Sequence, residues 1–232
     1  MSKLRLKQIV FLWAVAASAN AGWESADLER SESMNLTPDY QRGKAIYNAC
    51  AVCHMPEGWG TPNGAYPQIA GQHRTVTIKQ LADIRAKNRD NPSMYAFAID
   101  DVIGGPQAIA DVAYYIETLK MTGATGKGDG KQLEYGKKLY QQYCIACHGA
   151  QGEGSSEQAY PAIHAQHYNY LLRQLIWLQN GMRRNGNSEM AEIIKGLDKR
   201  AFMALSDYIS RMQPLYQKHS RHSWKEPGMQ ER

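Results

Sequence analysis

The feature that most constrains this chain is a five-residue pattern that occurs twice, as CAVCH at residues 50–54 and as CIACH at residues 144–148. The two copies together use all four cysteines of the chain. Two thiols three positions apart lie about one helical turn from each other, so both can reach the two vinyl groups on one edge of a porphyrin. The histidine that follows is then placed under the iron as its proximal ligand. The pattern therefore predicts two covalently attached haem c groups, held by Cys50 and Cys53 with His54 on the first iron, and by Cys144 and Cys147 with His148 on the second.

Disulfides and a structural zinc site are the other uses that four cysteines and two histidines suggest. Disulfides are common in exported proteins, but they leave the histidine after each cysteine pair unexplained. Zinc accepts thiolate and imidazole ligands in a tetrahedral arrangement. A histidine directly after the second cysteine is poorly spaced for that geometry. The sequence therefore favours haem attachment over both alternatives.

The N-terminus has the three parts of a secretory signal peptide. Lys3, Arg5 and Lys7 form a basic start, residues 9–17 are apolar, and an A-x-A cleavage pattern ends at Ala21. The alternative is a transmembrane anchor, but a spanning helix needs about 20 apolar residues. We therefore expect residues 1–21 to be a signal peptide that is cleaved near Ala21. The mature protein should then be exported to the periplasm, where c-type haem attachment takes place.

The features around the first motif recur in the same order at shifts of 93 to 96 residues. Internal repetition of this kind indicates two copies of one structural unit. The paired positions are Gly43 and Gly136, Lys44 and Lys137, Tyr47 and Tyr140, Tyr66 and Tyr160, Pro67 and Pro161, Gln72 and Gln166, His73 and His167, Gln80 and Gln174, Asn91 and Asn187, Met94 and Met190, and Tyr115 and Tyr208. The repeat predicts an all-α chain of two tandem domains with one haem each.

A glycine-rich stretch at residues 122–130 separates the two copies and reads as a linker. We expect the first domain to span residues 37–121 and the second to span residues 131–213. Residues 22–36 are polar and show no periodicity, which predicts a partly ordered leader. Residues 214–232 form a polar tail that contains histidine and lysine, and we expect it to be extended or disordered.

Helix signals within the first copy predict three helices and a loop. Thr37, followed by proline, predicts an N-cap that opens a helix over residues 38–49. Further helices are expected over residues 73–87 and 107–119, the latter because its apolar residues recur at helical spacing. Residues 91–94 are expected to form a loop that folds over the haem.

The sixth iron ligand is expected to be methionine in both domains. Met94 and Met190 occupy matching places in the repeat, and methionine ligation raises the reduction potential of a haem. The alternative is that both fill gaps in the core, which methionine does readily. In the second copy Met182 and Met203 lie near enough in sequence to compete with Met190 for the iron.

Histidines and prolines near the haem motifs supply further candidates. His73 and His167 repeat and are alternative sixth ligands, although each precedes a helix, where a histidine can simply cap the helix or face solvent. His164 has no counterpart in the first copy, and we expect a surface residue or a neighbour of the haem edge. Pro67 and Pro161 follow the haem motifs. We expect each proline carbonyl to accept the Nδ1–H of the proximal histidine and so fix its tautomer.

The charge of the mature chain is divided unevenly between its halves. Residues 22–124 hold nine Lys and Arg against twelve Asp and Glu, a net charge of −3, and residues 125–232 hold fifteen against ten, a net charge of +5. Such asymmetry can orient protein partners and speed their encounter, although it is also compatible with an ordinary solvated surface. The chain has no run of Lys and Arg, so we expect no nucleic-acid partner.

Taken together, the two haem motifs, the repeated Tyr-Pro and Gln-His segments, the segment Arg89–Met94 and the glycine-rich linker resemble the di-haem cytochrome c4 family over residues 38–213. The resemblance implies two class I cytochrome c folds with neighbouring haems and His/Met ligation. It also implies periplasmic electron transfer from a quinol-oxidising complex or a dehydrogenase to a terminal oxidase or reductase, either in solution or at a membrane surface. The second copy departs from the first at residues 162–165, and the tail is long, which puts the partner rather than the haems in doubt.

The expected function is that of an electron carrier without a small-molecule substrate or catalytic residues of its own. One alternative is a haem subunit of a larger dehydrogenase or oxidase complex. Another is a di-haem enzyme, since some relatives of the family oxidise thiosulfate with a cysteine as axial haem ligand. Attachment uses all four cysteines here, so that chemistry lacks its ligand.

Overall fold

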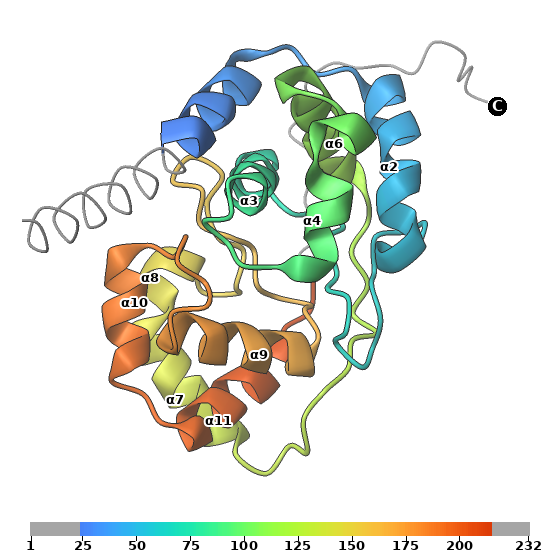
Figure 1. The fold of residues 1–232 in the computed structure, drawn as a ribbon. Coiled ribbons are helices and arrows are strands. Elements are labelled where there is room, and N and C mark those ends of the chain that lie inside the picture. The colour runs from blue at the N-terminus through green and yellow to red at the C-terminus, as the bar shows by residue number, and fades with distance from the viewer. Residues whose placement is uncertain (1–23, 215–232) are drawn as a thin grey trace, which may run out of the picture.

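The computed structural model describes residues 24–214, which fold into two helical domains placed one above the other (Figure 1). Apart from two isolated β-bridges, this part of the chain contains helices, turns and irregular segments. The predicted signal peptide (1–21) and residues 215–232 of the predicted tail lie outside the described residues. No helix between residues 24 and 214 combines the length and the apolar character that crossing a membrane requires.

The two domains repeat one order of helices. The first contains α2 (Tyr40–His54), α3 (Arg74–Arg85), α4 (Pro92–Ala98), α5 (Asp100–Ile103) and α6 (Pro106–Thr118). The second contains α7 (Leu133–Tyr143), α8 (Ile145–His148), α9 (Tyr168–Gln179), α10 (Ser188–Lys195) and α11 (Lys199–Ser210). α7 and α8 together correspond to α2, and the helices α9, α10 and α11 correspond to α3, α4 and α6. The predicted all-α fold of two tandem units is therefore confirmed.

Two glycines allow the first and last helices of each domain to cross closely. A Cβ on Gly43 in α2 would lie 2.2 Å from the carbonyl oxygen of Asp111 in α6. A Cβ on Gly136 in α7 would lie 2.2 Å from the carbonyl oxygen of Ala204 in α11. Any side chain at either position would push the two helices apart. The glycine therefore recurs because both domains have the same close crossing of helices.

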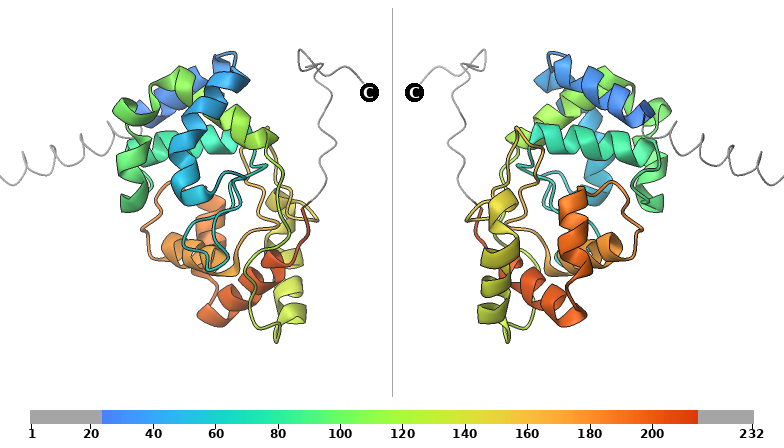
Figure 2. Two further views of the ribbon diagram at one scale, coloured as in Figure 1. Left: turned by 90° about the vertical axis from the view of Figure 1, so that its right-hand side faces the viewer. Right: turned by 90° about the vertical axis from the view of Figure 1, so that its left-hand side faces the viewer.

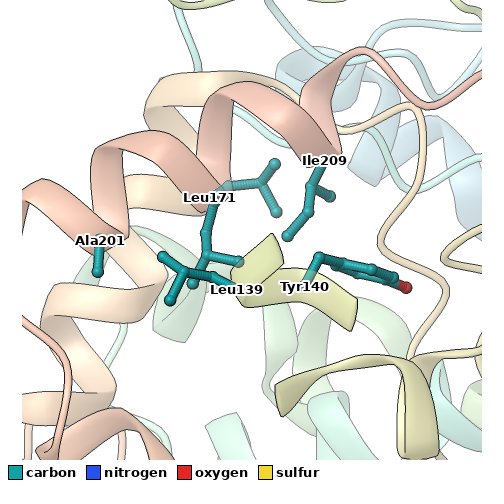
Figure 3. Close-up of a cluster of buried hydrophobic side chains, with 6 residues drawn as sticks. Leu139, Tyr140, Leu171, Ala201 and Ile209 are labelled. Carbon is teal, nitrogen blue, oxygen red and sulfur yellow. The ribbon is translucent and has the colours of Figure 1, made fainter. Parts of the chain in front are cut away.

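A buried tyrosine ties each crossing to the haem motif that follows. Tyr47 and Tyr140 are 3% and 1% exposed and lie in the apolar clusters of their domains. Figure 3 shows Tyr140 beside Leu139, Leu171 and Ile209. The Tyr47 hydroxyl donates to the carbonyl oxygen of Met55 (2.8 Å), and the Tyr140 hydroxyl donates to that of Gly149 (2.7 Å). The residue after each proximal histidine is thus anchored to the core.

Two expectations about the first domain are wrong. Asp39, not Thr37, caps the first helix, because the Asp39 carboxylate accepts the Arg42 backbone N–H, and the helix continues through His54. Residues 91–94 do not form a loop. Pro92 instead begins α4, with Asn91 at its N-cap position, since proline is well suited to the first turn of a helix.

The leader is more ordered than its sequence indicates. Residues 24–35 form a helix that lies on the first domain, on the side away from the second domain (blue in Figures 1 and 2). Ser33 in this helix is fully buried, and Glu29 forms an ion pair with Arg85. The Arg74 guanidinium donates to the carbonyl oxygens of Ser33 (2.8 Å) and Leu36 (3.1 Å). These contacts are mostly polar, which explains why hydrophobic periodicity did not reveal the helix.

The glycine-rich linker is held against the second domain. The N–H groups of Gly128 and Gly130 donate to the two carboxylate oxygens of Asp207, at 3.0 and 2.7 Å. A Cβ on Gly126 would lie 1.8 Å from the carbonyl oxygen of Pro62 in the first domain. The linker therefore acts as a fixed connection between the domains in spite of its composition.

Candidate haem sites

Helix geometry presents the two cysteines of each motif about one turn apart. Cys50 and Cys53 lie in the last turns of α2, whereas Cys144 lies at the junction of α7 and α8 and Cys147 lies within α8. All four side chains are partly buried, and none is paired with another in a disulfide. Burial raises the pKa of Cys50 to about 11 and that of Cys144 to about 12. Residues 24–214 also contain no cluster of three or more His, Cys, Asp and Glu side chains arranged for a metal ion.

Each proximal histidine is buried and has one nitrogen fixed by a carbonyl group. Nδ1 of His54 lies 2.9 Å from the Pro67 carbonyl oxygen, and Nδ1 of His148 lies 3.0 Å from that of Pro161. Since a carbonyl only accepts, Nδ1 carries the proton and Nε2 keeps its lone pair for a metal. Burial lowers the pKa of both rings, which favours the neutral, ligating form. The geometry expected for Pro67 and Pro161 is present in both domains.

A glycine that the sequence reasoning did not single out brings each carbonyl to its histidine. The Gly60 N–H donates to the His54 carbonyl oxygen (3.0 Å), and a Cβ on Gly60 would lie 2.4 Å from the Pro67 carbonyl oxygen. Gly154 repeats both features, with 2.9 Å to His148 and 2.6 Å to Pro161. Both glycines have positive φ, 66° and 68°. The signal was present in the sequence, since these glycines stand 94 residues apart.

The candidate methionines lie at matching places in the two domains. Met94 is in the first turn of α4 and Met190 is in the first turn of α10, and both side chains are partly buried. Met190 also packs against the apolar cluster of Leu178, Ile194 and Phe202. Its two competitors, Met182 and Met203, are each 39% exposed. Exposure makes these two poorer candidates than Met190 for a ligand in a buried haem pocket.

The side chains of the repeated histidines, His73 and His167, form hydrogen bonds across the domain interface. Nε2 of His73 lies 2.8 Å from the Glu153 carbonyl oxygen, and Nε2 of His167 lies 2.8 Å from the Trp59 carbonyl oxygen. His167 is only 1% exposed, so the expectation that it faces solvent is wrong, and its Nδ1 accepts the Gly126 N–H (3.1 Å). In this arrangement neither histidine offers Nε2 to an iron.

His164 is also buried, which contradicts its interpretation as a surface residue. Its side chain is 1% exposed, and its Nδ1 lies 3.1 Å from the carbonyl oxygen of Gln151. Nε2 lies 3.3 Å from the sulfur of Met121, the residue just before the linker. The imidazole fills space where the first domain has only Ala70, so it contributes to packing between the end of the first domain and the second domain.

Two glutamines join the segments that hold the proximal histidines. The Gln166 side chain accepts the Gln68 N–H (3.0 Å) and donates to the Gln68 carbonyl (2.8 Å). The Gln72 side chain accepts the Ala162 N–H (3.0 Å) and donates to the Ala162 carbonyl (2.9 Å). The same contact is thus made twice, related by a pseudo-two-fold axis. Gln68 and Ala162 directly follow the prolines whose carbonyl groups accept from His54 and His148, so the interface lies one residue from each of these carbonyl groups.

These residues fit haem c. Each domain offers two thiols at helical spacing and an imidazole nitrogen left free for iron. Haem also carries two carboxylates, and the domain interface contains the buried Arg89 and the partly buried Arg183, whose hydrogen bonds within residues 24–214 go to neutral oxygens.

Comparison with known proteins assigns the two domains to related families. The Cytochrome c family matches residues 40–120. The family described as Cytochrome C oxidase, cbb3-type, subunit III matches residues 131–209. Each match contains one CxxCH motif, so both copies of the repeat are cytochrome c domains.

Cytochrome c4 of Azotobacter vinelandii is 32% identical over 185 residues, which cover 72% of this chain and 85% of that protein. The chain belongs to the cytochrome c4 family. It therefore carries two covalently bound haem c groups, as its motifs predicted. The crystal structure of reduced recombinant cytochrome c4 from Pseudomonas stutzeri matches with a TM-score of 0.68 and 26% identity, and covers 76% of this chain and all of that one. A thiosulfate dehydrogenase electron acceptor of Stutzerimonas stutzeri is 26% identical over 171 residues, which cover 71% of this chain and 79% of that protein.

Proposed function

We propose that this di-haem cytochrome is a periplasmic electron carrier that passes single electrons from a quinol-oxidising complex or a dehydrogenase to a terminal oxidase or reductase. The observation that carries the proposal is the short connection between the domains. The His54 ring binds the Pro67 carbonyl, and the next residue, Gln68, is hydrogen bonded to Gln166 of the second domain. The haem supplies the redox chemistry, because its iron changes between two oxidation states, and the protein sets potential and access.

The proposed iron ligands are His54 and Met94 in the first domain and His148 and Met190 in the second. A sixth site filled by methionine suits electron transfer, because it raises the potential and leaves no open position for a substrate. Support comes from the fixed tautomer of both histidines and from the matching positions of the two methionines at the starts of α4 and α10.

Replacing Met94 and Met190 one at a time by alanine tests this ligation. The oxidised wild-type protein should show the far-red charge-transfer band of methionine–iron bonds, and each variant should lose about half of it. Met203→Ala is the matched control, since Met203 lies on the surface and its loss should leave the band intact. Carbon monoxide binding or a high-spin spectrum in the wild-type protein would contradict the proposal and favour an enzyme.

The proposal includes export of the protein through a cleaved signal peptide and the bounds of its two domains. We place the cleavage site near Ala21, the first domain at residues 37–121, the linker at 122–130 and the second domain at 131–213. The helix at residues 24–35 would then begin just inside the mature chain and pack on the first domain. N-terminal sequencing of the protein from a periplasmic fraction tests the cleavage site, and a first residue well beyond position 22 would contradict it.

A second candidate function is that of a haem subunit bound to a dehydrogenase. It is favoured by the similarity to a protein named thiosulfate dehydrogenase electron acceptor. The two candidates differ in the lifetime of the complex, which affinity purification from the native periplasm measures. A stoichiometric partner that survives high salt supports the subunit, whereas a partner released by salt supports the carrier, because electrostatic docking is screened.

A further inference from the structure

One arginine holds the C-terminal end of the helix that carries Met94. Arg85 is the last residue of α3. Its Nε donates to the carbonyl oxygen of Ala98 (2.7 Å), the last residue of α4, and a terminal nitrogen donates to that of Gly104 (2.8 Å), just after α5. The final carbonyl groups of a helix have no partner within the helix and attract a cation. Arg85 therefore fixes one end of α4, and Met94 lies in the first turn at the other end.

The second domain makes the same kind of contact with a different side chain. Gln179 is the last residue of α9. Its side-chain amide donates to the carbonyl oxygens of Ile194 (3.3 Å) and Leu197 (2.8 Å), at the end of α10. Met190 lies in the first turn of this helix. The helix that carries the candidate methionine is therefore held, in both domains, by the last residue of the helix before it.

The two contacts occupy equivalent positions in the repeat. Gln179 stands 94 residues after Arg85, which is the shift of the paired glutamines earlier in the same two helices. Ile194 stands 96 residues after Ala98, which is the shift of the two candidate methionines. Neither position keeps its residue type between the copies. A contact that recurs with unlike side chains indicates that both domains need the end of this helix in a fixed place.

An ion-pair network surrounds the arginine of the first domain, whereas the glutamine of the second is neutral. Arg85 forms ion pairs with Glu29 of the leader helix (residues 24–35) and with Asp100 of α5 (2.5 Å). The side chains of Arg85 and Glu29 are 15% and 16% exposed, so this pair is largely shielded from water. Gln179 is exposed. Since hydrogen bonds from a charged donor are the stronger ones, the end of α4 is held more firmly than the end of α10.

We propose that Arg85 and Gln179 are positioning residues that keep Met94 and Met190 on the haem irons, and that the leader helix strengthens this hold in the first domain through Glu29. A helix of seven or eight residues moves as one body, so a fixed last turn also restrains the thioether in the first turn. Release of the helix end should let the methionine leave the iron and admit another ligand. The inference rests on the proposed His/Met ligation and adds that the first haem keeps its methionine more firmly than the second.

Imidazole competition on the ferric holoprotein measures how firmly each methionine is held. In the Met190→Ala variant the far-red methionine–iron band comes from the first haem alone, and in Met94→Ala it comes from the second alone. The measured quantity is the imidazole concentration that removes half of the remaining band. This concentration should be higher for the first haem than for the second, and an equal or lower value would contradict the difference between the domains.

Substitutions in the Met190→Ala background test the arginine and the leader helix. Arg85→Ala should lower the half-loss concentration about tenfold, because charged hydrogen bonds to two carbonyl groups are removed. Arg85→Gln, which copies the second domain, should give a value between those of arginine and alanine. Glu29→Ala should lower the concentration less than Arg85→Ala does. Glu32→Ala, at an exposed position of the same helix, is the matched control and should leave it unchanged.

Two further variants separate positioning from a general loss of stability. Arg42→Ala also removes an ion pair of the first domain, the one with Asp111 (2.8 Å), but this pair joins α2 to α6 rather than to α4. It should leave the half-loss concentration unchanged. Gln179→Ala in the Met94→Ala background should lower the concentration for the second haem.

An unchanged concentration in the alanine variant of either positioning residue would overturn the proposal. An equal fall in Arg42→Ala would also overturn it, since general destabilisation would then be the cause. No change in Glu29→Ala would refute the role of the leader helix. If Met94→Ala and Met190→Ala instead each keep the full band, the ligation in the proposed function is wrong, so the two failures are distinguishable.

Discussion

Replacing Gln166 by alanine should weaken the attachment of the two domains without unfolding either. The side chain is 8% exposed and makes both hydrogen bonds to the backbone of Gln68, one from the Gln68 N–H and one to its carbonyl. Gln68 is itself only 3% exposed, and the Gln166 side-chain oxygen also accepts the His167 N–H (3.0 Å), so the substitution leaves two buried donors and one buried acceptor without this partner. Each such group costs about 1–3 kcal/mol, and partial entry of water reduces the sum to about 3 kcal/mol.

Differential scanning calorimetry of the holoprotein measures this loss. For a protein of this size about 1 kcal/mol lowers the midpoint by about 2–4 °C, so the main transition should fall by about 10 °C or divide into two domain transitions. Gln41→Ala on the exposed face of α2 is the matched control and should leave the midpoint unchanged.

The pseudo-two-fold partner provides a second check. Gln72→Ala removes the equivalent contact with Ala162 and should produce a similar shift. Once one substitution has separated the domains, the other glutamine contact is already broken. The double variant should therefore lose less stability than the sum of the losses in the two single variants. A midpoint within about 2 °C of wild type in both single variants would refute the reasoning that these amides hold the domains together.

Two further predictions follow from the second domain. Gly136→Ala would place a Cβ 2.2 Å from the Ala204 carbonyl oxygen, and such overpacking should cost about 1–3 kcal/mol of the free energy of unfolding in urea. Gly196→Ala is the control and should not destabilise the protein, because Gly196 has a negative φ and the nearest atom to its Cβ would lie 3.6 Å away. Burial lowers the pKa of His167 in the folded protein. The neutral side chain therefore contributes fully to the free energy of unfolding above the ordinary pKa of about 6.5. This contribution is lost as the pH falls toward the folded pKa, because the unfolded chain then binds more protons than the folded chain. His167→Gln should therefore lose less stability than wild type between pH 7.5 and 5.5, and an unchanged pH dependence of the urea midpoint would contradict this.

Local patterns predicted the parts of the site that depend on neighbours in sequence. The CxxCH motifs lie within one or two helical turns, so their spacing alone indicates what they bind. The proline carbonyls could also be expected, because the distance along the chain from His54 to Pro67 is the same as that from His148 to Pro161, 13 residues in each case.

Contacts between the copies could not be predicted in the same way. The repeat revealed that Gln72 and His73 recur, but their partners, Ala162 and Glu153, are 90 and 80 residues away. No periodicity connects residues on opposite sides of an interface. The error at residues 91–94 has a different cause, since an Asn-Pro pair is compatible with a turn and with the start of a helix, and only tertiary packing decided for the helix.

The doubled glutamine contact bears on how the two domains are related. A patch that contacts its own equivalent across a two-fold axis is the signature of an isologous interface, the kind that joins identical subunits. Gln166 on Gln68 and Gln72 on Ala162 repeat one contact in both directions. The two domains thus meet as two copies of one subunit would, although a single chain carries both. His164, opposite Ala70 in the repeat, marks where the halves differ.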